Sequence, residues 1–112
     1  MMATIEKSGD ITIVTLAIDT LDSGNEKRFK KEVIPIFEPN SKVILDMREV
    51  DFIDSSGLGM LLSCYRHVSA TSGELRLCNL NEQVRTLFEL VRMHRVFDIY
   101  DSRAEAIQSF AS

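Results

Sequence analysis

The chain has 112 residues, of which 45% are hydrophobic, and its formal net charge is −4. This length suits a single domain with one hydrophobic core. The negative charge argues against a nucleic-acid partner and against an anionic membrane surface, because both usually require a basic face. The apolar runs fall far below the roughly 18 residues of a membrane-spanning helix, and the N-terminus lacks the pattern of a signal peptide. We therefore expect a cytoplasmic protein without a membrane partner, in which Cys64 and Cys78 are reduced and bind no metal.

The first half of the chain predicts a strand hairpin, a helix and a buried strand. Residues 2–7 predict a weak edge strand, and residues 11–16 alternate apolar and polar side chains, as a half-buried strand does. Residues 19–24 predict a polar loop, in which Asp22 or Ser23 caps a helix over residues 25–34. Residues 42–47 contain an unbroken apolar run with β-branched side chains, which is typical of a strand buried on both faces.

The second half predicts helices and strands in alternation. Apolar residues spaced by three and four predict an amphipathic helix that follows residue 55 and ends near residue 71. Strands are predicted over residues 74–78 and 96–100, and a final helix over residues 103–110, capped by Ser102. Between these two strands, Asn81 opens the most strongly patterned helix. Its buried face is predicted to contain Val84, Leu87, Phe88 and Val91.

This order of elements predicts an α/β fold. Strands separated by helices form right-handed parallel crossovers, and the opening hairpin adds an antiparallel edge. We therefore expect one domain over residues 1–112, with a mixed, mostly parallel sheet of about five strands and about four helices. The strand over residues 42–47 should be central. The loop between it and the next helix lies at the carboxyl end of a strand, where open α/β sheets usually place their sites.

That loop contains the sequence DSSGLG over residues 54–59, reached from a strand that ends in Ile-Leu-Asp. In this context the hexapeptide resembles the signature of the STAS domain. More narrowly, it resembles that of the small bacterial anti-anti-sigma factors, also called anti-sigma factor antagonists. The resemblance covers nearly the whole chain and implies the same order of strands and helices. In that family, the first serine after the aspartate is phosphorylated by an anti-sigma factor that is also a serine kinase, and this serine corresponds to Ser55.

The resemblance implies a partner-switching protein. Unphosphorylated, such a protein binds the anti-sigma kinase and releases the sigma factor that the kinase restrains. A metal-dependent serine phosphatase of the PPM type resets it. The chain would be the substrate of both enzymes and would need no cofactor of its own. The residues expected to contact the partner are Asp22, Asp54, Ser55, Ser56, Gly57, Leu58, Gly59, Met60 and Ser63.

Two turns depart from the family pattern. The family usually has a glycine before Leu-Asp near residue 20, where this chain has Asp19 and Thr20. It also commonly has a glycine after the third helix, where this chain has Arg92. A left-handed residue without glycine is costly, so we expect the turn over Arg92 to Arg95 to be built differently.

The residues of the loop allow a switch or a purely structural role for the serines. Ser55 is predicted just before a helix that begins near Ser56 or Gly57, where amide donors and a partial positive charge would stabilise a phosphate. Gly57 and Gly59 would thin the surface for a partner's backbone. From the residues alone, the alternative is that a serine is only the helix cap, with Asp54 as a loop residue.

Further along the predicted helix, two residues fall off its apolar stripe. A soft methionine beside small residues suits a partner interface, so Met60 is a candidate contact residue. The alternative is that Met60 and Cys64 are buried at the margin of the stripe. The residues alone leave both interpretations open.

Other classes of function fit less well. A hydrolase elbow needs glycine two residues before the serine, where Ile53 or Asp54 stands. A phospho-acceptor aspartate of the response-receiver type needs a lysine near the last strand, and the chain has none after Lys42. Asp46 and Asp51 are therefore predicted to be turn and cap residues. The alternative to the phosphorylation switch is a STAS scaffold or sensor module that works in a larger assembly without phosphorylation.

Overall fold

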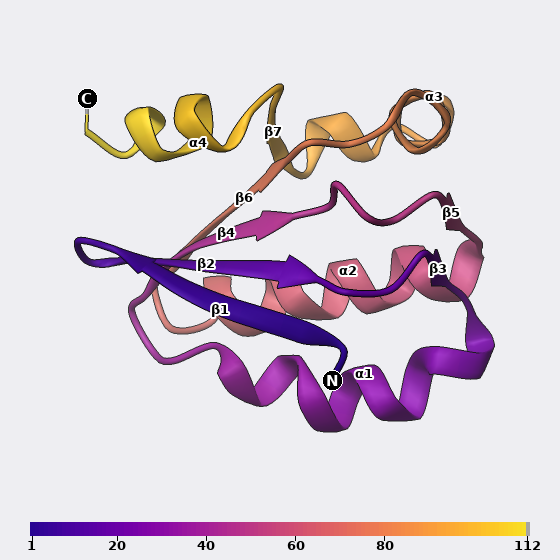
Figure 1. Ribbon diagram of the computed structural model, residues 1–112, viewed down its shortest axis with the longest axis horizontal. Coiled ribbons are helices and arrows are strands. Elements are labelled where there is room, and N and C mark those ends of the chain that lie inside the picture. The colour runs from indigo at the N-terminus through magenta and orange to yellow at the C-terminus, as the bar shows by residue number, and fades with distance from the viewer. Residues whose placement is uncertain (112) are drawn as a thin grey trace.

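The computed structural model describes residues 1–111, which form a five-stranded sheet with helices on both faces (Figure 1). The strand order is β1-β2-β4-β6-β7, in which β1 and β2 pair antiparallel and the other neighbours pair parallel. The strands are β1 (Ala3–Ser8), β2 (Ile11–Leu16), β4 (Lys42–Asp46), β6 (Glu74–Cys78) and β7 (Asp98–Tyr100). The predicted mixed sheet, with an antiparallel hairpin at one edge and β4 at its centre, is confirmed.

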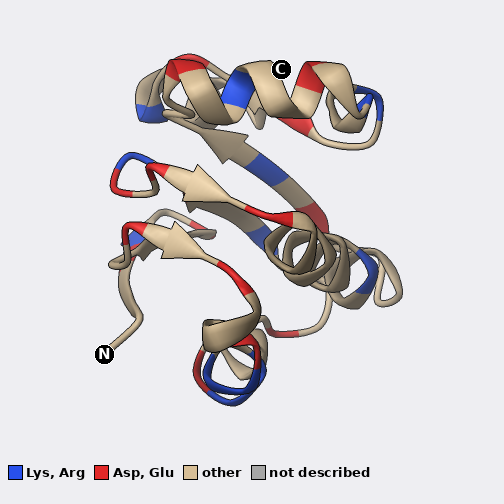
Figure 2. Cartoon of the chain, turned by 90° about the vertical axis from the view of Figure 1, so that its right-hand side faces the viewer, with Lys and Arg blue, Asp and Glu red and all other residues tan. Residues whose placement is uncertain are grey.

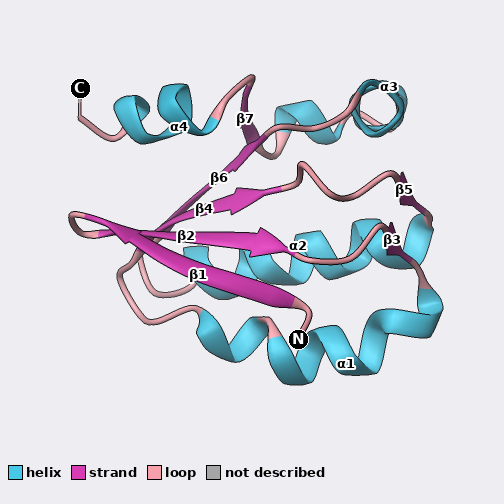
Figure 3. Ribbon diagram, in the orientation of Figure 1, coloured by secondary structure: helices cyan, strands magenta, loops and turns pink. Residues whose placement is uncertain are grey.

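The four α-helices within residues 1–111 follow the predicted order. They are α1 (Glu26–Glu32), α2 (Ser55–Ser69), α3 (Glu82–Leu90) and α4 (Arg103–Ser109), with 3-10 turns at Ser23–Asn25, Ile34–Ile36 and Met93–Arg95. Figure 3 shows α4 on one side of the sheet and α1 with α2 on the other. None of these helices is long and apolar enough to cross a membrane.

Strand β4 is buried on both faces, as its apolar run predicts. Val43, Ile44 and Leu45 are each 0% exposed. Successive side chains of a strand point to opposite faces, so Val43 and Leu45 join the main core with residues of α1, α2 and α3, whereas Ile44 packs beneath α4. The carboxyl end of β4 is thereby fixed at the centre of the molecule, and the loop that follows it starts from a rigid position.

Strand β2 differs from the prediction, because all six of its residues are buried rather than half of them. Helix α4 covers the second face of the sheet, where Ile11 and Ile13 cluster with Ala106. Thr15 is buried there too, and its hydroxyl accepts a 3.0 Å hydrogen bond from the guanidinium of Arg103. A threonine with a hydrogen-bond partner can be buried at little cost, so the polar side chain of Thr15 did not indicate an exposed face of the strand.

The chain after α3 differs from the prediction in two ways. Val84 and Phe88 are buried as expected, but Val91 lies past the last helical residue and is 43% exposed. Arg92 adopts the left-handed conformation, with φ 61° and ψ 27°, although it is not glycine. The expectation of a different turn was therefore wrong. The turn delivers Phe97 into the core, where it is 3% exposed and contacts the ring of Phe88, and this packing offsets the strain.

Asp46 is not the turn residue that was predicted but the buried end of β4, with 0% exposure. Its carboxylate accepts hydrogen bonds from the side chains of Arg48 at 2.9 Å, Asn79 at 3.1 Å and Arg103 at 3.1 Å. Burial alone raises the pKa of this carboxyl, but the hydrogen bonds from Arg48, Asn79 and Arg103 outweigh it and lower the pKa below its ordinary value. Because Arg103 is the first residue of α4, this cluster holds α4 against the sheet.

Both cysteines belong to the core. Cys64 and Cys78 are free and 0% exposed. Burial raises the pKa of the Cys78 thiol to about 12 and also raises that of Cys64. A thiol that stays protonated at neutral pH is a weak nucleophile, so both side chains serve as small apolar groups.

Candidate functional site

The site begins where the chain enters α2. Asp54 is the N-cap of this helix, and its carboxylate accepts a 2.9 Å hydrogen bond from the amide of Gly57. Its carbonyl oxygen accepts a 3.0 Å hydrogen bond from the amide of Leu58. The helix therefore starts at Ser55, one residue before the predicted start. Asp54 provides the cap, so the alternative that a serine only caps the helix is wrong.

Ser55 stands at the first helical position and is exposed, as predicted. Within residues 1–111, its hydroxyl makes no hydrogen bond, because Asp54 already satisfies the amide that a capping serine would serve. Ser56, the next residue, is half-buried. The first amides of a 15-residue helix carry a partial positive charge, which favours an anion on Ser55.

A second, two-stranded ladder holds this entry in place, and sequence reasoning missed it. Strand β3 (Thr20–Leu21) pairs parallel with β5 (Phe52–Ile53), so Asp22 and Asp54 follow the last paired residues of adjacent strands. The amide of Asp54 donates a 3.1 Å hydrogen bond to the carbonyl of Leu21. Segments of two residues show no periodicity, so both strands lie in stretches that were predicted to be loops, at residues 19–24 and between β4 and α2.

Asp22 is a helix cap, as predicted, but of the 3-10 turn that precedes α1. Its carboxylate accepts a 2.9 Å hydrogen bond from the amide of Gly24, and its amide donates at 3.0 Å to the side chain of Asn25. This reciprocal pair fixes the loop beside Asp54. The ladder thus brings two capping aspartates, from segments about thirty residues apart in sequence, to the same end of the sheet.

The two glycines of the motif have different roles. A Cβ atom on Gly57 would lie 2.3 Å from the carbonyl oxygen of Leu21 and 2.8 Å from Cγ2 of Ile53. Gly57 is buried and allows close packing against β3, so the prediction that it thins the surface is wrong. A Cβ atom on Gly59 would meet no atom within 4 Å, so this glycine lies beside open space.

Met60 is 2% exposed and Cys64 is 0% exposed. The interpretation of Met60 as a contact residue is therefore wrong, and the alternative, burial at the margin of the apolar stripe, is confirmed. Leu58 is half-buried and packs against the main core. Ser63 is half-buried, and its hydroxyl donates a 3.1 Å hydrogen bond to the carbonyl of Gly59. Ser63 lies about two helical turns after Ser55.

The surface that faces outward around Ser55 is acidic. Figure 2 looks onto this end of the molecule, where red segments flank both short strands. Among the described residues, none of its five carboxylates takes part in an ion pair. They belong to Asp19, Asp22, Glu49, Asp51 and Asp54. Asp51, which was predicted to be a turn or cap residue, lies in the loop before β5, and its amide donates a 2.7 Å hydrogen bond to the carbonyl of Asp19.

A model of the STAS domain family matches residues 2–106. The chain belongs to the STAS family. A protein of Bordetella bronchiseptica named "Putative anti-sigma factor antagonist BtrV" is 29% identical over 111 residues, which cover 98% of this chain and 95% of that protein. The anti-sigma F factor antagonist of Paenibacillus polymyxa is 31% identical over 65 residues, which cover 58% of this chain and 56% of that protein.

Solved structures support the same family. The crystal structure of a putative anti-sigma factor antagonist from Thermotoga maritima superposes on this chain with a TM-score of 0.85. It is 28% identical in sequence, and the match covers 99% of this chain and 96% of that one. The predicted membership of the STAS family, with relatives named anti-sigma factor antagonists, is confirmed.

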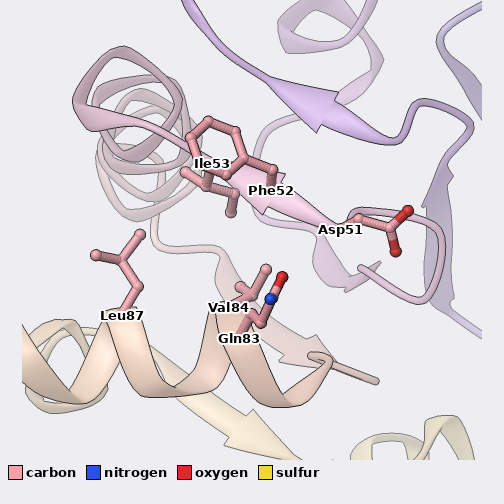
Figure 4. A pocket seen from close by; sticks show the side chains of 6 residues that line it. All are labelled: Asp51, Phe52, Ile53, Gln83, Val84 and Leu87. Atoms are coloured by element: carbon pink, nitrogen blue, oxygen red, sulfur yellow. The ribbon is translucent and has the colours of Figure 1, made fainter.

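One further feature of this STAS domain escaped sequence reasoning. Phe52 is 56% exposed and lies on the opposite face of β5 from the buried Ile53. Beside it is a pocket of about 290 Å³ between β5 and α3. Its lining consists of Asp51, Phe52, Ile53, Gln83, Val84 and Leu87, and Figure 4 shows Val84 and Leu87 pointing from α3 toward β5. An aromatic residue directly after Asp51 was the available signal, but only the tertiary contact with α3 creates the pocket.

Proposed function

We propose that this STAS domain is an anti-sigma factor antagonist whose binding is switched by phosphorylation of Ser55. Unphosphorylated, it binds an anti-sigma factor with serine kinase activity in the cytoplasm and thereby releases the sigma factor. The kinase uses ATP to phosphorylate Ser55, and a metal-dependent serine phosphatase of the PPM type restores the hydroxyl. The chain acts as a binding module and as the substrate of both enzymes.

The observation that supports this proposal best is the exposed hydroxyl of Ser55 at the first position of α2. It has no hydrogen-bond partner within residues 1–111, because Asp54 provides the helix cap. A kinase can therefore reach this hydroxyl without breaking a structural contact. Ser56 is half-buried and one position further into the helix, so it is the poorer acceptor.

The fold should accept the phosphate. Phosphorylation adds roughly −1.5 to −2 charges at neutral pH, and the first turn of a helix stabilises negative charge. The carboxylates of Asp54 and Asp22 oppose it, but each already accepts a hydrogen bond from a backbone amide. We expect these opposing effects to leave the folded state largely unchanged, so that the switch acts on partner binding.

Incubation with the anti-sigma kinases encoded in the same genome, followed by mass spectrometry of the intact protein, tests the proposal. Ser55→Ala should abolish phosphorylation, whereas Ser56→Ala, the matched control on the next residue, should remain a substrate. Phosphopeptide mapping that placed the phosphate on Ser56 would refute the assignment. If no kinase modified either serine, the chain would instead be a scaffold or sensor module that binds without phosphorylation.

A further inference from the structure

The pocket beside Phe52 lies next to the proposed phosphorylation site. Phe52 precedes Ser55 by three residues, so at most about 11 Å separates their Cα atoms. A standard protein interface covers about 800 Å² on each partner, which corresponds to a disc of about 16 Å radius. A partner large enough to act on Ser55 would therefore also cover Phe52 and its pocket.

The chemistry of the pocket suits an apolar side chain. Val84 and Leu87 of α3 point toward β5 (Figure 4), and Ile53 and Phe52 of β5 line the pocket with them. Phe52 remains 56% exposed, although a ring of this size is usually buried in a domain core or an interface. Exposed aromatic residues beside a pocket are typical of the few positions that dominate binding energy. The sheet does not require an aromatic residue here, because Ile53 alone makes the core contact of β5.

One acidic side chain lines the pocket, and others lie close to it in the sequence. Asp51 lines the pocket itself, and the carbonyl of Asp19 accepts a hydrogen bond from its amide. Glu49 stands two residues before Asp51 and Asp54 two residues after Phe52, and both belong to the acidic surface around Ser55. None of these carboxylates has an ion-pair partner within residues 1–111. An acidic surface beside an apolar pocket complements a basic surface that carries an apolar side chain.

We infer that this pocket receives an apolar side chain from a basic surface of the anti-sigma factor, so that Phe52 and Asp51 anchor the partner over Ser55. This inference rests on the proposed function. It assigns two tasks to two parts of the site: the pocket supplies affinity, and Ser55 supplies the switch. A second copy of the chain is a poorer occupant, since symmetric pairing through this end would bring the two acidic surfaces together.

The experiment measures binding of the kinase that modifies Ser55, by surface plasmon resonance at two salt concentrations. Phe52→Ser should weaken binding at least tenfold, mainly through faster dissociation. The matched control is Ile5→Ser on β1, since Ile5 is 52% exposed and lies at the far edge of the sheet. Asp51→Asn should slow association and reduce its dependence on salt, whereas Asp98→Asn on β7 should change neither. Circular dichroism checks that each variant is folded.

The outcomes separate the two proposals. If the kinase phosphorylates Ser55 but binds Phe52→Ser as tightly as the parent, the pocket inference is wrong and the proposed function stands. If sedimentation shows that the parent self-associates and that Phe52→Ser is monomeric, the occupant is a second copy, and the inference is again overturned.

If no kinase modifies Ser55, the proposed function fails, and the pocket is tested with synthetic peptides instead. A lysine-rich peptide with one leucine should shift the amide NMR signals of Ile53, Val84 and Leu87, and the same peptide with serine in place of leucine should not. Equal shifts with both peptides, or no shifts at all, would overturn the inference.

Discussion

The carbonyl oxygen of Leu21 occupies the space beside Gly57, where a side chain would otherwise stand. A Cβ atom on Gly57 would lie only 2.3 Å from that oxygen. The same carbonyl accepts a 3.1 Å hydrogen bond from the amide of Asp54. The first turn of α2 is thus locked against β3 by backbone contact, and Ser55 is presented from a fixed position rather than from a mobile loop.

Gly57→Ala should therefore destabilise the protein. A backbone carbonyl cannot move aside as a flexible side chain can, so the added methyl group would force the ladder apart, at a cost of about 1–3 kcal/mol. Gly59→Ala is the matched control in the same helix, because its Cβ would meet no atom within 4 Å. It should leave stability unchanged or raise it by about 0.5–1 kcal/mol, since glycine weakens helices. Urea unfolding of both variants measures the difference, and equal midpoints would contradict this account.

The contact between Leu21 and Gly57 also shows where prediction from the sequence stopped. Long segments with clear periodicity, such as β4 and α2, were predicted to within two residues of their observed ends. Strands β3 and β5 have two residues each and form only because the loops that contain them lie side by side in the fold. Burial of Gly57 depends on the same tertiary contact, so no local pattern could indicate it.

Asp46 illustrates a different limit. A charged residue at the end of a strand is usually exposed, so a turn was the reasonable prediction. Its burial depends on Arg103, which is 57 residues away in sequence and donates a 3.1 Å hydrogen bond to the carboxylate. The exposed position of Ser55 at the start of α2, by contrast, could be predicted from the sequence, because the motif around it and the helix that follows are both local.

Asp46→Asn should lower stability by about 1–3 kcal/mol at neutral pH, since the guanidinium groups of Arg48 and Arg103 lose their carboxylate. The sign of the pH dependence follows from the lowered pKa of Asp46. Its ionised form favours the folded state, so this stability is present above the ordinary value of 3.8 and is lost as pH falls through the lower pKa of the folded protein. The difference between parent and variant should therefore shrink below about pH 4.

Urea unfolding at several pH values measures this difference. Asp51→Asn is the control, because Asp51 is exposed and has no ion-pair partner within residues 1–111. It should change stability by less than about 0.5 kcal/mol, as surface substitutions commonly do. If Asp46→Asn were as stable as the parent at neutral pH, the cluster would not be what holds α4 against the sheet.

Arg92→Gly should stabilise the protein. The left-handed conformation of Arg92 costs about 1–2 kcal/mol in a residue with a Cβ atom. Glycine removes this strain, but it also gives the unfolded chain more conformational freedom, which lowers the stability of the folded state by about 0.5–1 kcal/mol. We expect a net gain of about 0.5–1 kcal/mol, visible as a higher melting temperature. Arg95→Gly, in the following 3-10 turn and also exposed, should lower it instead.

Ser55→Asp tests how the switch works. Aspartate carries one charge at the start of α2, where the helix favours it, so the variant should melt within a few degrees of the parent. At the interface, however, the charge must lose water against a surface that accommodates a small hydroxyl, and a mispaired buried charge costs several kcal/mol. Each 1.4 kcal/mol lowers affinity about tenfold, so binding to the kinase should fall by a hundredfold or more.

The kinetics identify the cause. In the proposed complex the carboxylates around Ser55 attract a basic partner, and one more charge at this end should leave the association rate nearly unchanged or raise it slightly. The loss of affinity should therefore appear as faster dissociation, in contrast to Asp51→Asn, which should act on association. Calorimetry of Ser55→Asp and plasmon resonance against the kinase measure both quantities. Slow association with unchanged dissociation would indicate long-range repulsion by the partner, and the account based on desolvation at the interface would then be wrong.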